Sequence, residues 1–363
     1  MHRCKLCLMP DSLPGSDFDS EGICSWCRQA YPVYTVKGEQ VLKNKLVGIG
    51  SHKGEADCLV GLSGGKDSTY ALYRLVKHYK IKAEAFIYTH DGSRDFAVNN
   101  AIQTCKILGV KLHQVSLPKH THMDSFLNFF KAWLAKPDAI SAGMTCVACK
   151  HLHILGSRLA TKRRIPYIVW SSTPLEYSPF LAIRHKGNAS NQFQREGMLR
   201  SGMQLAKATL SSSRFAQGLL RQPCTSVLGC LAVFPNSSFL RKRYPRVKPL
   251  MFYSYEKWDP GKILDTIITE LEWKIPAEIK EDWHTDCVFN VFKEYMFQKM
   301  YGVSYTDAHL SNQIRHAYLS RSDAMQKLKE SKQFYSASLV PALKFLGAEA
   351  LISEIDHLCF NVE

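Results

Sequence analysis

A short glycine-containing run at residues 63–69, Ser-Gly-Gly-Lys-Asp-Ser-Thr, constrains this chain more than any other feature. It directly follows the apolar residues 58–62, which predict a buried strand, and precedes a stretch whose apolar residues have helical spacing. Backbone N–H groups at a helix N-terminus are unpaired and lie at the positive end of the helix dipole. Two glycines let that backbone come close to phosphate oxygens. The run therefore predicts a phosphate-binding loop between a strand and a helix.

The segments that follow alternate between strand and helix patterns. Strands are predicted at residues 83–88, 110–117 and 165–170, and helices at residues 96–108, 126–134 and 152–161. This alternation predicts an α/β fold, in which a parallel sheet carries helices on both faces. Residues 260–351 have a helical pattern that is interrupted near residues 283–287 and at Gly302.

We expect four parts along the 363 residues. They are a zinc-knuckle domain at 1–32, the α/β domain at 50–185, an inserted lid-like segment at 186–250, and a helical C-terminal region at 251–363. The inserted segment is predicted because residues 186–245 are rich in Ser, Gly, Gln, Arg and Met and have few strand signals. The first 30 residues are too short for a hydrophobic core, so they need a cross-link such as a bound metal to fold.

The side chains of residues 63–69 extend the prediction to ATP. Lys66 adds a full positive charge, the Ser and Thr hydroxyl groups add hydrogen-bond donors, and Asp67 is a candidate ligand for Mg²⁺. The run is not a Walker A loop, because Asp67 follows the lysine where that loop has Ser or Thr.

Instead, the run resembles the Ser-Gly-Gly-x-Asp-Ser signature of the PP-loop ATP pyrophosphatases, which have a HUP-like fold. The resemblance implies that AMP is transferred to a substrate oxygen, with Lys66 and Asp67 as catalytic residues and the adenosine near residues 88–91. It also implies that ATP is bound by Ser63, Gly64, Gly65, Lys66, Asp67, Ser68 and Thr69.

Four of the twelve cysteines predict a zinc site near the N-terminus. Cys4 and Cys7 form one Cys-x-x-Cys pair, and Cys24 and Cys27 form a second pair after 16 intervening residues. Two such pairs at this separation are typical of a tetrahedral Cys₄ zinc site. Zinc binding supplies the folding energy that so short a segment lacks. All four ligand positions are filled by cysteine, so we expect a structural or docking role.

A third Cys-x-x-Cys pair, Cys146 and Cys149, is a candidate for catalysis. Lys150, His151 and His153 follow it, and such electropositive surroundings predict a lowered thiol pKa. Three interpretations stay open: ligands of an iron–sulfur cluster, carriers of sulfur as a persulfide, or residues that line the substrate pocket.

A cluster needs more than two cysteine ligands. The candidates for a third are Cys224, Cys230 and Cys287, and Cys287 stands among polar residues at a break between helical stretches. We therefore predict Cys146, Cys149 and Cys287 as catalytic residues or cluster ligands. Cys58, Cys105 and Cys359 are predicted to be small buried hydrophobic residues. His284 and His309 are acid–base candidates, with a structural role as the alternative.

The chain carries 47 Lys and Arg against 32 Asp and Glu, a formal charge of +15. The excess favours anionic partners: nucleotides, nucleotide sugars, RNA or an acidic protein. The densest basic patches are residues 162–164 and residues 241–243 with Arg246 and Lys248. A solvated basic face remains an equal alternative for each patch.

No apolar run approaches the roughly 18–20 residues of a membrane helix, and no signal peptide is visible at the start. These observations predict a cytoplasmic location without membrane association, and cysteines that are reduced rather than joined in disulfides.

The resemblance to one PP-loop family extends over most of the chain outside residues 186–245. The N-terminal cysteine pairs, residues 63–70, the Cys146 pair, residues 166–170, residues 255–260 and residues 308–311 are similar to the N-acetyl sugar amidotransferase family. This family is linked to the conversion of an acetamido group on a nucleotide-linked sugar into an acetamidino group. The resemblance implies adenylation of the amide oxygen by ATP and displacement of AMP by ammonia from a separate glutaminase.

Cys287 departs from that family's pattern and favours an alternative. PP-loop thiolation enzymes share the zinc knuckles and the loop, and they hold a cluster with three cysteines. That resemblance implies sulfur transfer to tRNA or to a small-molecule carbonyl, with a separate sulfur-donor protein. A nucleotide-sensing scaffold without catalysis is a third hypothesis, which the intact Lys66, Asp67 and Ser68 disfavour. We also expect a homo-oligomer.

Overall fold

A computed structural model of the chain describes residues 2–13, 15–29, 35–47, 56–173, 175, 203, 205–277, 279 and 284–355. Residues 186–202 of the predicted inserted segment and Cys359 lie outside the described residues. Among the described residues, no helix has the length and apolar character needed to cross a membrane.

The centre of the fold is a five-stranded sheet with the order β3-β2-β1-β4-β5. All four neighbouring pairs are parallel. The strands are β1 (Cys58–Gly61), β2 (Ala83–Tyr88), β3 (Lys111–Val115), β4 (Tyr167–Trp170) and β5 (Lys248–Met251). The four strands predicted from the sequence are thereby confirmed. The chain builds outward from β1 to β2 and β3, then returns to place β4 on the other side of β1, so the direction of winding changes between β1 and β4. Parallel sheets bind ligands outside the carboxyl ends of the strands at such a point.

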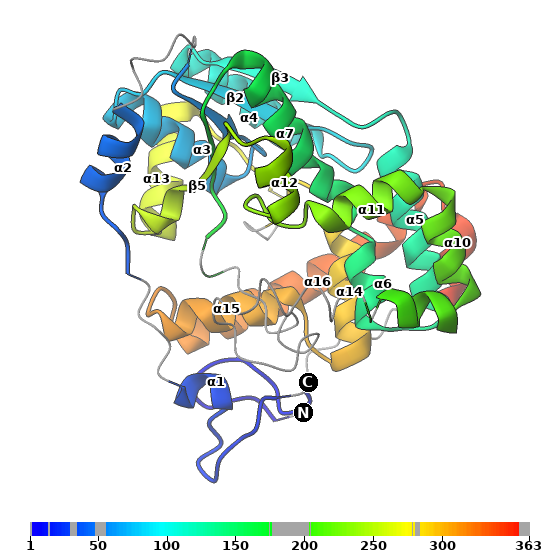
Figure 1. The fold of residues 1–363 in the computed structure, drawn as a ribbon. Helices are drawn as coiled ribbons and strands as arrows, with labels where there is room; N and C mark the ends of the chain where they lie inside the picture. Colours follow the sequence, from blue (N-terminus) through cyan, green and yellow to red (C-terminus); the bar gives the residue numbers. More distant parts are fainter. Residues whose placement is uncertain are drawn as a thin grey trace.

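Side chains of successive strand residues enter two different apolar layers. Val60, Ala85 and Val169 face one layer, which also contains residues of four helices: α2 (Glu39–Val47), α3 (Lys66–Tyr73), α4 (Asp95–Leu108) and α13 (Pro260–Leu271). Leu59 and Ile168 face the other layer, beneath α7 (His151–Arg163). The helices therefore cover both faces of the sheet, as the alternating sequence pattern predicts (Figure 1).

Strand β5 is a structural feature that the sequence analysis did not predict. It lies within the expected inserted segment and contains Pro249, which cannot donate a backbone hydrogen bond. The proline is tolerated because β5 is an edge strand with a neighbour on one side only.

A second group of helices surrounds an aromatic core beside the sheet (Figure 1). Its helices are α5 (Thr121–Ala135), α6 (Ala139–Met144), α14 (Asn290–Tyr301), α15 (Tyr305–Arg315) and α16 (Arg321–Phe345). Phe126 of α5 stacks on Phe289 with ring centroids 4.3 Å apart. Trp133 of α5 meets Tyr295 of α14 edge-on at 5.7 Å. The helical C-terminal region predicted from the sequence is present, and Gly302 ends α14 with a φ of 66°.

Between β4 and β5, the described residues include the helices α10 (Ser213–Arg221), α11 (Pro223–Leu231) and α12 (Ser238–Arg243). Two histidines of α7 hold α11 and its end in place. His151 Nε2 lies 2.9 Å from the Thr225 carbonyl oxygen, and His153 Nδ1 lies 2.6 Å from the Ala232 carbonyl oxygen. The described part of the expected inserted segment is therefore packed onto the α/β domain.

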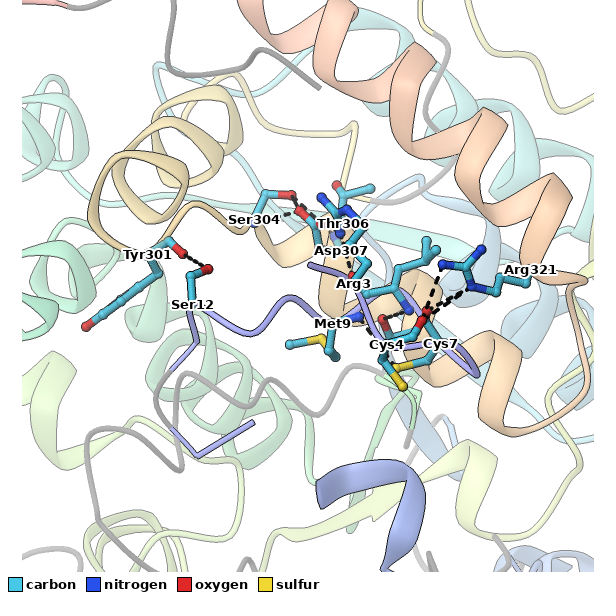
Figure 2. Close-up of polar contacts among 12 residues, drawn as sticks. Arg3, Cys4, Cys7, Met9, Ser12, Tyr301, Ser304, Thr306, Asp307 and Arg321 are labelled. Carbon is cyan, nitrogen blue, oxygen red and sulfur yellow. Dashed lines mark hydrogen bonds and ion pairs between the residues drawn. The ribbon is translucent and has the colours of Figure 1, made fainter. Parts of the chain in front are cut away.

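The N-terminal cysteine segment, residues 2–29 with its short helix α1 (Ser25–Arg28), is attached to the C-terminal helices (Figure 2). Arg3 forms a salt bridge of 2.6 Å with the buried carboxylate of Asp307. Leu8 N–H donates to Ser311 Oγ at 3.1 Å, and Ser12 Oγ donates to the Tyr301 carbonyl oxygen at 3.0 Å. Its cysteines belong to the same apolar core as α14 and α16.

Glu294 is a buried carboxyl group between α14 and α15. Its side chain has no exposed surface, and its Oε1 has no hydrogen-bond partner among the described residues. Burial raises the pKa of Glu294 to about 7, although hydrogen bonds from Ser304 and Thr306 act in the opposite direction. The folded state therefore binds this proton more tightly than the unfolded chain does.

We expect Glu294→Gln to flatten the pH dependence of stability. The favourable contribution of the protonated group is present below pH 4.5 and is lost as the pH rises towards 7. At pH 8 the variant should exceed the wild type in free energy of unfolding by up to about 3 kcal/mol, and at pH 4.5 the two should agree. Urea denaturation across this range measures the difference. Glu349→Gln, at an exposed position, is the control, and equal slopes for wild type and Glu294→Gln would contradict the assignment.

Candidate active site

The loop between β1 and α3 lies at the carboxyl edge of the sheet and has a conformation that requires glycine. Gly64 has a φ of +81°, and a Cβ placed there would lie 1.8 Å from the Ala97 carbonyl oxygen in α4. Gly65 is the N-cap of α3 and offers no side-chain acceptor to the first turn of that helix. The helix N-terminus is therefore capped by no side chain, as a phosphate site requires.

Hydroxyl groups of the same loop fix its shape. Ser68 Oγ donates to the Gly65 carbonyl oxygen and accepts from Ser63 N–H, both at 3.2 Å. Ser63 Oγ accepts from Gly65 N–H at 3.2 Å. Thr69 Oγ1 is buried and has no hydrogen-bond partner among the described residues. The predicted nucleotide-binding residues therefore lie together in one preformed turn.

Three aromatic residues from the C-terminal half hold this loop. Trp258 Nε1–H donates to Asp67 Oδ1 at 2.7 Å, and Trp273 Nε1–H donates to the Gly64 carbonyl oxygen at 2.8 Å. The Tyr253 hydroxyl donates to the Asp67 carbonyl oxygen at 3.0 Å. The sequence analysis did not identify these contacts, since they join residues 186 to 209 positions apart. They orient the Asp67 carboxylate, the predicted magnesium ligand.

The segment that carries Cys287 lies antiparallel to the turn after β2. Ser93 and Cys287 form an isolated bridge, Arg94 N–H donates to the Asp286 carbonyl oxygen at 3.0 Å, and Val288 N–H donates to that of Gly92 at 2.8 Å. Cys287 Sγ lies 3.9 Å from His90 Nε2. Cys287 is thus brought to the carboxyl edge of the sheet, beside the end of β2.

The predicted thiols Cys146 and Cys149 lie on the opposite side of the same region, in the turn between α6 and α7. Both contribute to the raised pKa of Cys287, whose main cause is burial. Burial also raises the pKa of Cys149 to about 11, and Lys150 offsets this only in part. The expectation that the basic neighbours lower this pKa is therefore wrong, because burial outweighs the charge of Lys150.

The other two candidates for a third thiol lie on α11, which packs against the same turn: a Cβ at Gly229 would lie 2.3 Å from the Val147 carbonyl oxygen. Cys224 is exposed, and Cys230 Sγ contacts Met144 Sδ at 3.7 Å. Cys58 and Cys105 are buried in the apolar layer of the sheet, as predicted. Cys146 and Cys149 act electrostatically on Cys287, but the three do not form a compact group like that of the N-terminal cysteines among the described residues, so the choice of a third cluster ligand stays a prediction.

Lys293 of α14 is a central charge that the sequence analysis missed. Burial alone would lower its pKa, but the nearby thiols of Cys146, Cys287 and Cys149 outweigh burial and raise it. Its ammonium group therefore stays charged and favours negative charge on sulfur. No local motif marks Lys293, because only the packing of α14 brings it to the cysteines.

Asp286 and His284 join the thiol region to the nucleotide loop. Burial raises the pKa of Asp286, opposed by Lys293, Arg94 and a hydrogen bond with Ser63. Burial also lowers the pKa of His284 well below its usual value, and the positive charges of Lys293 and Lys66 add to this effect. Burial and the two lysines disfavour the imidazolium form, so this histidine is a weak base that can still make hydrogen bonds. His309, the other predicted acid–base candidate, is buried and lies edge-on to the Trp258 ring, 6.3 Å between centroids.

A cavity of about 360 Å³ opens beside the end of β2, where the sequence analysis placed the adenosine. It is lined by Thr89, His90, Asp91, Ser116, Leu117, Pro118, Lys119 and His122. The rings of His90 and His122 are 3.9 Å apart, and burial lowers the pKa of His90 to about 4. Neutral, closely spaced imidazole rings and a carboxylate suit an aromatic base with polar edges.

Cys4, Cys7, Cys24 and Cys27 form the second site. Their sulfur atoms all lie within 4.8 Å of one another, and no other group of three or more His, Cys, Asp or Glu residues in the described ranges does so. The Cys4–Cys27 and Cys7–Cys24 distances are 3.8 and 3.7 Å. Tetrahedral zinc with Zn–S bonds of about 2.3 Å requires sulfurs about 3.8 Å apart, so the donor set fits a single metal ion.

Two arginines of the C-terminal helices support this cysteine group, and Figure 2 shows one of them, Arg321, beside Cys4 and Cys7. Arg315 Nη1 donates to Cys7 Sγ at 3.3 Å, and Arg321 donates to the carbonyl oxygens of Cys4 and Cys7. Hydrogen bonds with Cys24 and Cys27 lower the pKa of Cys7, and Arg315 adds to the effect. One thiolate, that of Cys7, is therefore favoured before a metal binds, whereas hydrogen bonds with Cys27 and Cys7 raise the pKa of Cys24.

The fold and these sites define a parallel α/β protein with a phosphate-type loop, a thiol-lined centre and a separate four-cysteine metal site. No protein-family model and no curated protein matches the sequence. One similar structure is NMN synthetase from Francisella tularensis, at 12% identity over 82% of this chain and 92% of that chain, with a TM-score of 0.37. Another is the U34-tRNA thiolase NcsA from Methanococcus maripaludis with its [4Fe-4S] cluster, at 14% identity over 98% and 90%, with a TM-score of 0.33. At these scores neither structure assigns an activity to this chain.

Gly64→Ala should abolish binding of a non-hydrolysable ATP analogue, because its methyl group cannot be placed without moving α4 from the loop. Gly109→Ala is the matched control: its φ is also positive, at 65°, but the added Cβ meets nothing within 4 Å. The control should lose only about 1 kcal/mol of stability and keep its affinity. Isothermal titration calorimetry tests the pair, and unchanged affinity in Gly64→Ala would place the nucleotide elsewhere.

Cys7→Ser should remove the bound metal and loosen residues 2–29, while the sheet stays folded. The sheet's two apolar layers contain no residue of the cysteine segment. Metal content by mass spectrometry should fall from near one ion per chain to near zero, and limited proteolysis should cut first within the segment. Cys224→Ser, at an exposed cysteine, should change neither. Loss of the whole thermal transition in Cys7→Ser would show instead that the sheet depends on the metal.

Proposed function

We propose that this chain is a PP-loop ATP pyrophosphatase. It transfers AMP from ATP to a carbonyl or amide oxygen of an acceptor, releases pyrophosphate, and lets a nitrogen nucleophile displace AMP. The observation that carries the proposal is the loop of residues 63–69, held at the carboxyl edge of the sheet with an uncapped helix N-terminus behind it. The sequence of the loop differs from the Walker A pattern, and Trp258 and Trp273 hydrogen-bond to it. Both features fit a site for the pyrophosphate part of ATP.

ATP fits the residues present. Gly64 and Gly65 leave room for phosphate oxygens, Lys66 supplies positive charge, and the first turn of α3 supplies N–H donors. Asp67 would hold Mg²⁺, since Trp258 orients its carboxylate. The cavity of about 360 Å³ beside His90 and Asp91 would hold the adenosine.

In the first step, the acceptor oxygen attacks the α-phosphorus, and the bond from that phosphorus to the pyrophosphate oxygen breaks. In the second step, ammonia attacks the activated carbon, the carbon–oxygen bond breaks, and AMP leaves. The nitrogen loses a proton, which water or the phosphate of the departing AMP takes up. Applied to an acetamido group on a nucleotide-linked sugar, these steps give an acetamidino group.

A second candidate function is sulfur transfer, and the convergence of Cys146, Cys149 and Cys287 around Lys293 favours it. The adenylation step is the same, and a sulfur nucleophile displaces AMP from the activated carbonyl of tRNA or a small molecule. The three thiols would ligate an iron–sulfur cluster or carry sulfur as a persulfide. The four-cysteine site binds zinc in either case and has a structural role, since it has no open ligand position.

The partners follow from the chemistry. Nitrogen transfer requires a separate protein that supplies ammonia, and sulfur transfer requires a protein that supplies sulfur. The acceptor is anionic or nucleotide-linked, which the positive charge of the chain favours. We also propose that the protein works as a homo-oligomer.

The test measures AMP and pyrophosphate after incubation with Mg-ATP, ammonium chloride and UDP-N-acetylglucosamine, or with Mg-ATP, sulfide and bulk tRNA. We expect AMP and pyrophosphate in equal amounts and a loss of at least about 100-fold in Lys66→Ala. Lys77→Ala, at an exposed position beyond α3, is the control. Release of ADP and phosphate, or full turnover in Lys66→Ala, would refute the proposal.

Anaerobic purification distinguishes the two nucleophiles. Zinc near one per chain without iron or acid-labile sulfide supports nitrogen transfer. Iron and sulfide that are present in the wild type and absent in Cys287→Ala support sulfur transfer. Cys230→Ser, at a half-buried cysteine whose sulfur contacts Met144 Sδ, should not change the metal content.

A further inference from the structure

The net positive charge of this protein comes from one third of the chain. Residues 139–255 contain 17 Lys and Arg but only two acidic residues, Glu176 and Glu196. The other 246 residues contain 30 basic and 30 acidic residues, so they carry no net charge. The whole formal charge of +15 therefore belongs to the segment from α6 to the residues just after β5.

The fold places many of these charges on one surface, which both basic patches of the sequence share. Strand β5 starts beside the end of α7, where Lys248 N–H donates to the Pro166 carbonyl oxygen at 2.8 Å. Helix α12 leads into β5 from the same side (Figure 1, green). We call the result the α7–α12 basic surface, and it consists of the exposed residues Arg158, Lys162, Arg164, Arg241, Lys242, Arg243, Arg246 and Lys248.

Among the described residues, the side-chain contacts of these eight cations are local: Arg241 donates to Ser238 Oγ at 3.2 Å, and Arg243 lies over the Tyr244 ring. None of them forms a salt bridge with an acidic residue in the described parts of the chain. Arg163, which lies between two of them in sequence, is different: its guanidinium group turns inward and pairs with Glu84 at 2.6 Å. Eight unneutralised charges on one face repel one another, so the surface is most stable with an anion bound.

The surface is remote from the nucleotide loop and separate from the thiols. Arg164 and Lys248 lie at the amino ends of β4 and β5, whereas Ser63 lies at the carboxyl edge of the sheet. Arg158 and Lys162 are four residues apart on α7 and therefore share one face of that helix. Residues 151–157 are not exposed, so the surface does not extend along α7 to Cys149.

The composition of the surface indicates which anion it fits. No large hydrophobic side chain within residues 158–164 or 241–248 is exposed, although Val233 and Phe234 are exposed just before α12. Protein interfaces bury an apolar centre and are poor in lysine, and membrane-surface helices insert apolar side chains. By contrast, the side chains of Leu220 on α10 and Val227 on α11 are 77% and 57% exposed. A purely cationic surface of this kind suits a row of phosphates.

We propose that the α7–α12 basic surface binds nucleic acid through its phosphate backbone. Binding here is separate from the ATP chemistry at Lys66, so the Lys66→Ala variant keeps it. Contacts to the backbone do not read base sequence, and the affinity depends steeply on salt.

The experiment measures fluorescence anisotropy of a labelled 20-nucleotide RNA hairpin, and of a DNA hairpin of the same sequence, from 0.05 to 0.3 M salt. The wild type should bind both with micromolar affinity, as is typical of non-specific complexes. Arg241→Glu/Lys242→Glu/Arg243→Glu should weaken binding about 100-fold at 0.1 M salt. Each lost phosphate contact removes roughly 0.7–0.9 from the slope of log K against log salt, so the slope should fall by roughly 2 to 3.

The matched control is Lys327→Glu/Lys329→Glu/Lys344→Glu, which changes the net charge equally at exposed positions of α16. It should keep the affinity within a few-fold and keep the slope. Lys162→Glu/Arg164→Glu tests the surface on a second element in case the first variant fails to fold, as thermal melting would reveal.

Three results would overturn the proposal. The first is no binding of either hairpin by the wild type at 0.1 M salt. The second is an equal loss of affinity in the control and the surface variants. The third is displacement of the hairpins by polyglutamate of equal charge, or binding to phosphatidylserine vesicles alone, which would assign the surface to an acidic protein or to a lipid surface.

Discussion

The indole hydrogen bonds of Trp258 and Trp273 to the loop of residues 63–69 are the contacts on which the site depends most. A glycine loop with a positive φ is free to adopt other shapes, and its helix N-terminus has no side-chain cap. Two indole donors, fixed in the apolar layer that α13 forms against the sheet, select one of those shapes. They also direct the Asp67 carboxylate. The loop is therefore rigid before any nucleotide binds, which lowers the entropic cost of binding.

Burial dominates the electrostatics at the thiol centre. The basic neighbours of Cys149 do not lower its pKa, because the removal of water disfavours the thiolate more than Lys150 stabilises it. The pKa of Lys293 is raised although the side chain is buried, because the thiols of Cys146, Cys287 and Cys149 favour its charged form. The centre is thus organised so that negative charge on sulfur is compensated by one ammonium group, whether the sulfur ligates iron, carries a persulfide or contacts the acceptor.

Local patterns predicted much of the fold. The strands at residues 58–61 and 83–88 are short apolar runs bounded by turn residues, and Gly109 ends α4 with a φ of +65°. The spacing of Cys4, Cys7, Cys24 and Cys27 predicted that their sulfurs lie close together, because the ligands of a metal site of this kind come in closely spaced pairs on short loops. Strand β5 was missed because Pro249 weakens its strand pattern, and its position at the sheet edge is not visible locally. The choice of Cys287 over Cys224 and Cys230 rested on polar context and stays a prediction, although Cys287 lies beside His90 at the end of β2.

By itself, then, the sequence determined the parallel α/β class, the phosphate loop and the four-cysteine site, since each depends on residues close together in the chain. Only the tertiary structure decided what surrounds them. Asp286, His284 and Lys293 come to the loop and the thiols from the C-terminal helices. The two basic patches join into one surface because β5 pairs beside α7. Contacts across a hundred or more residues depend on packing, and neither composition nor periodicity encodes which distant side chains will meet.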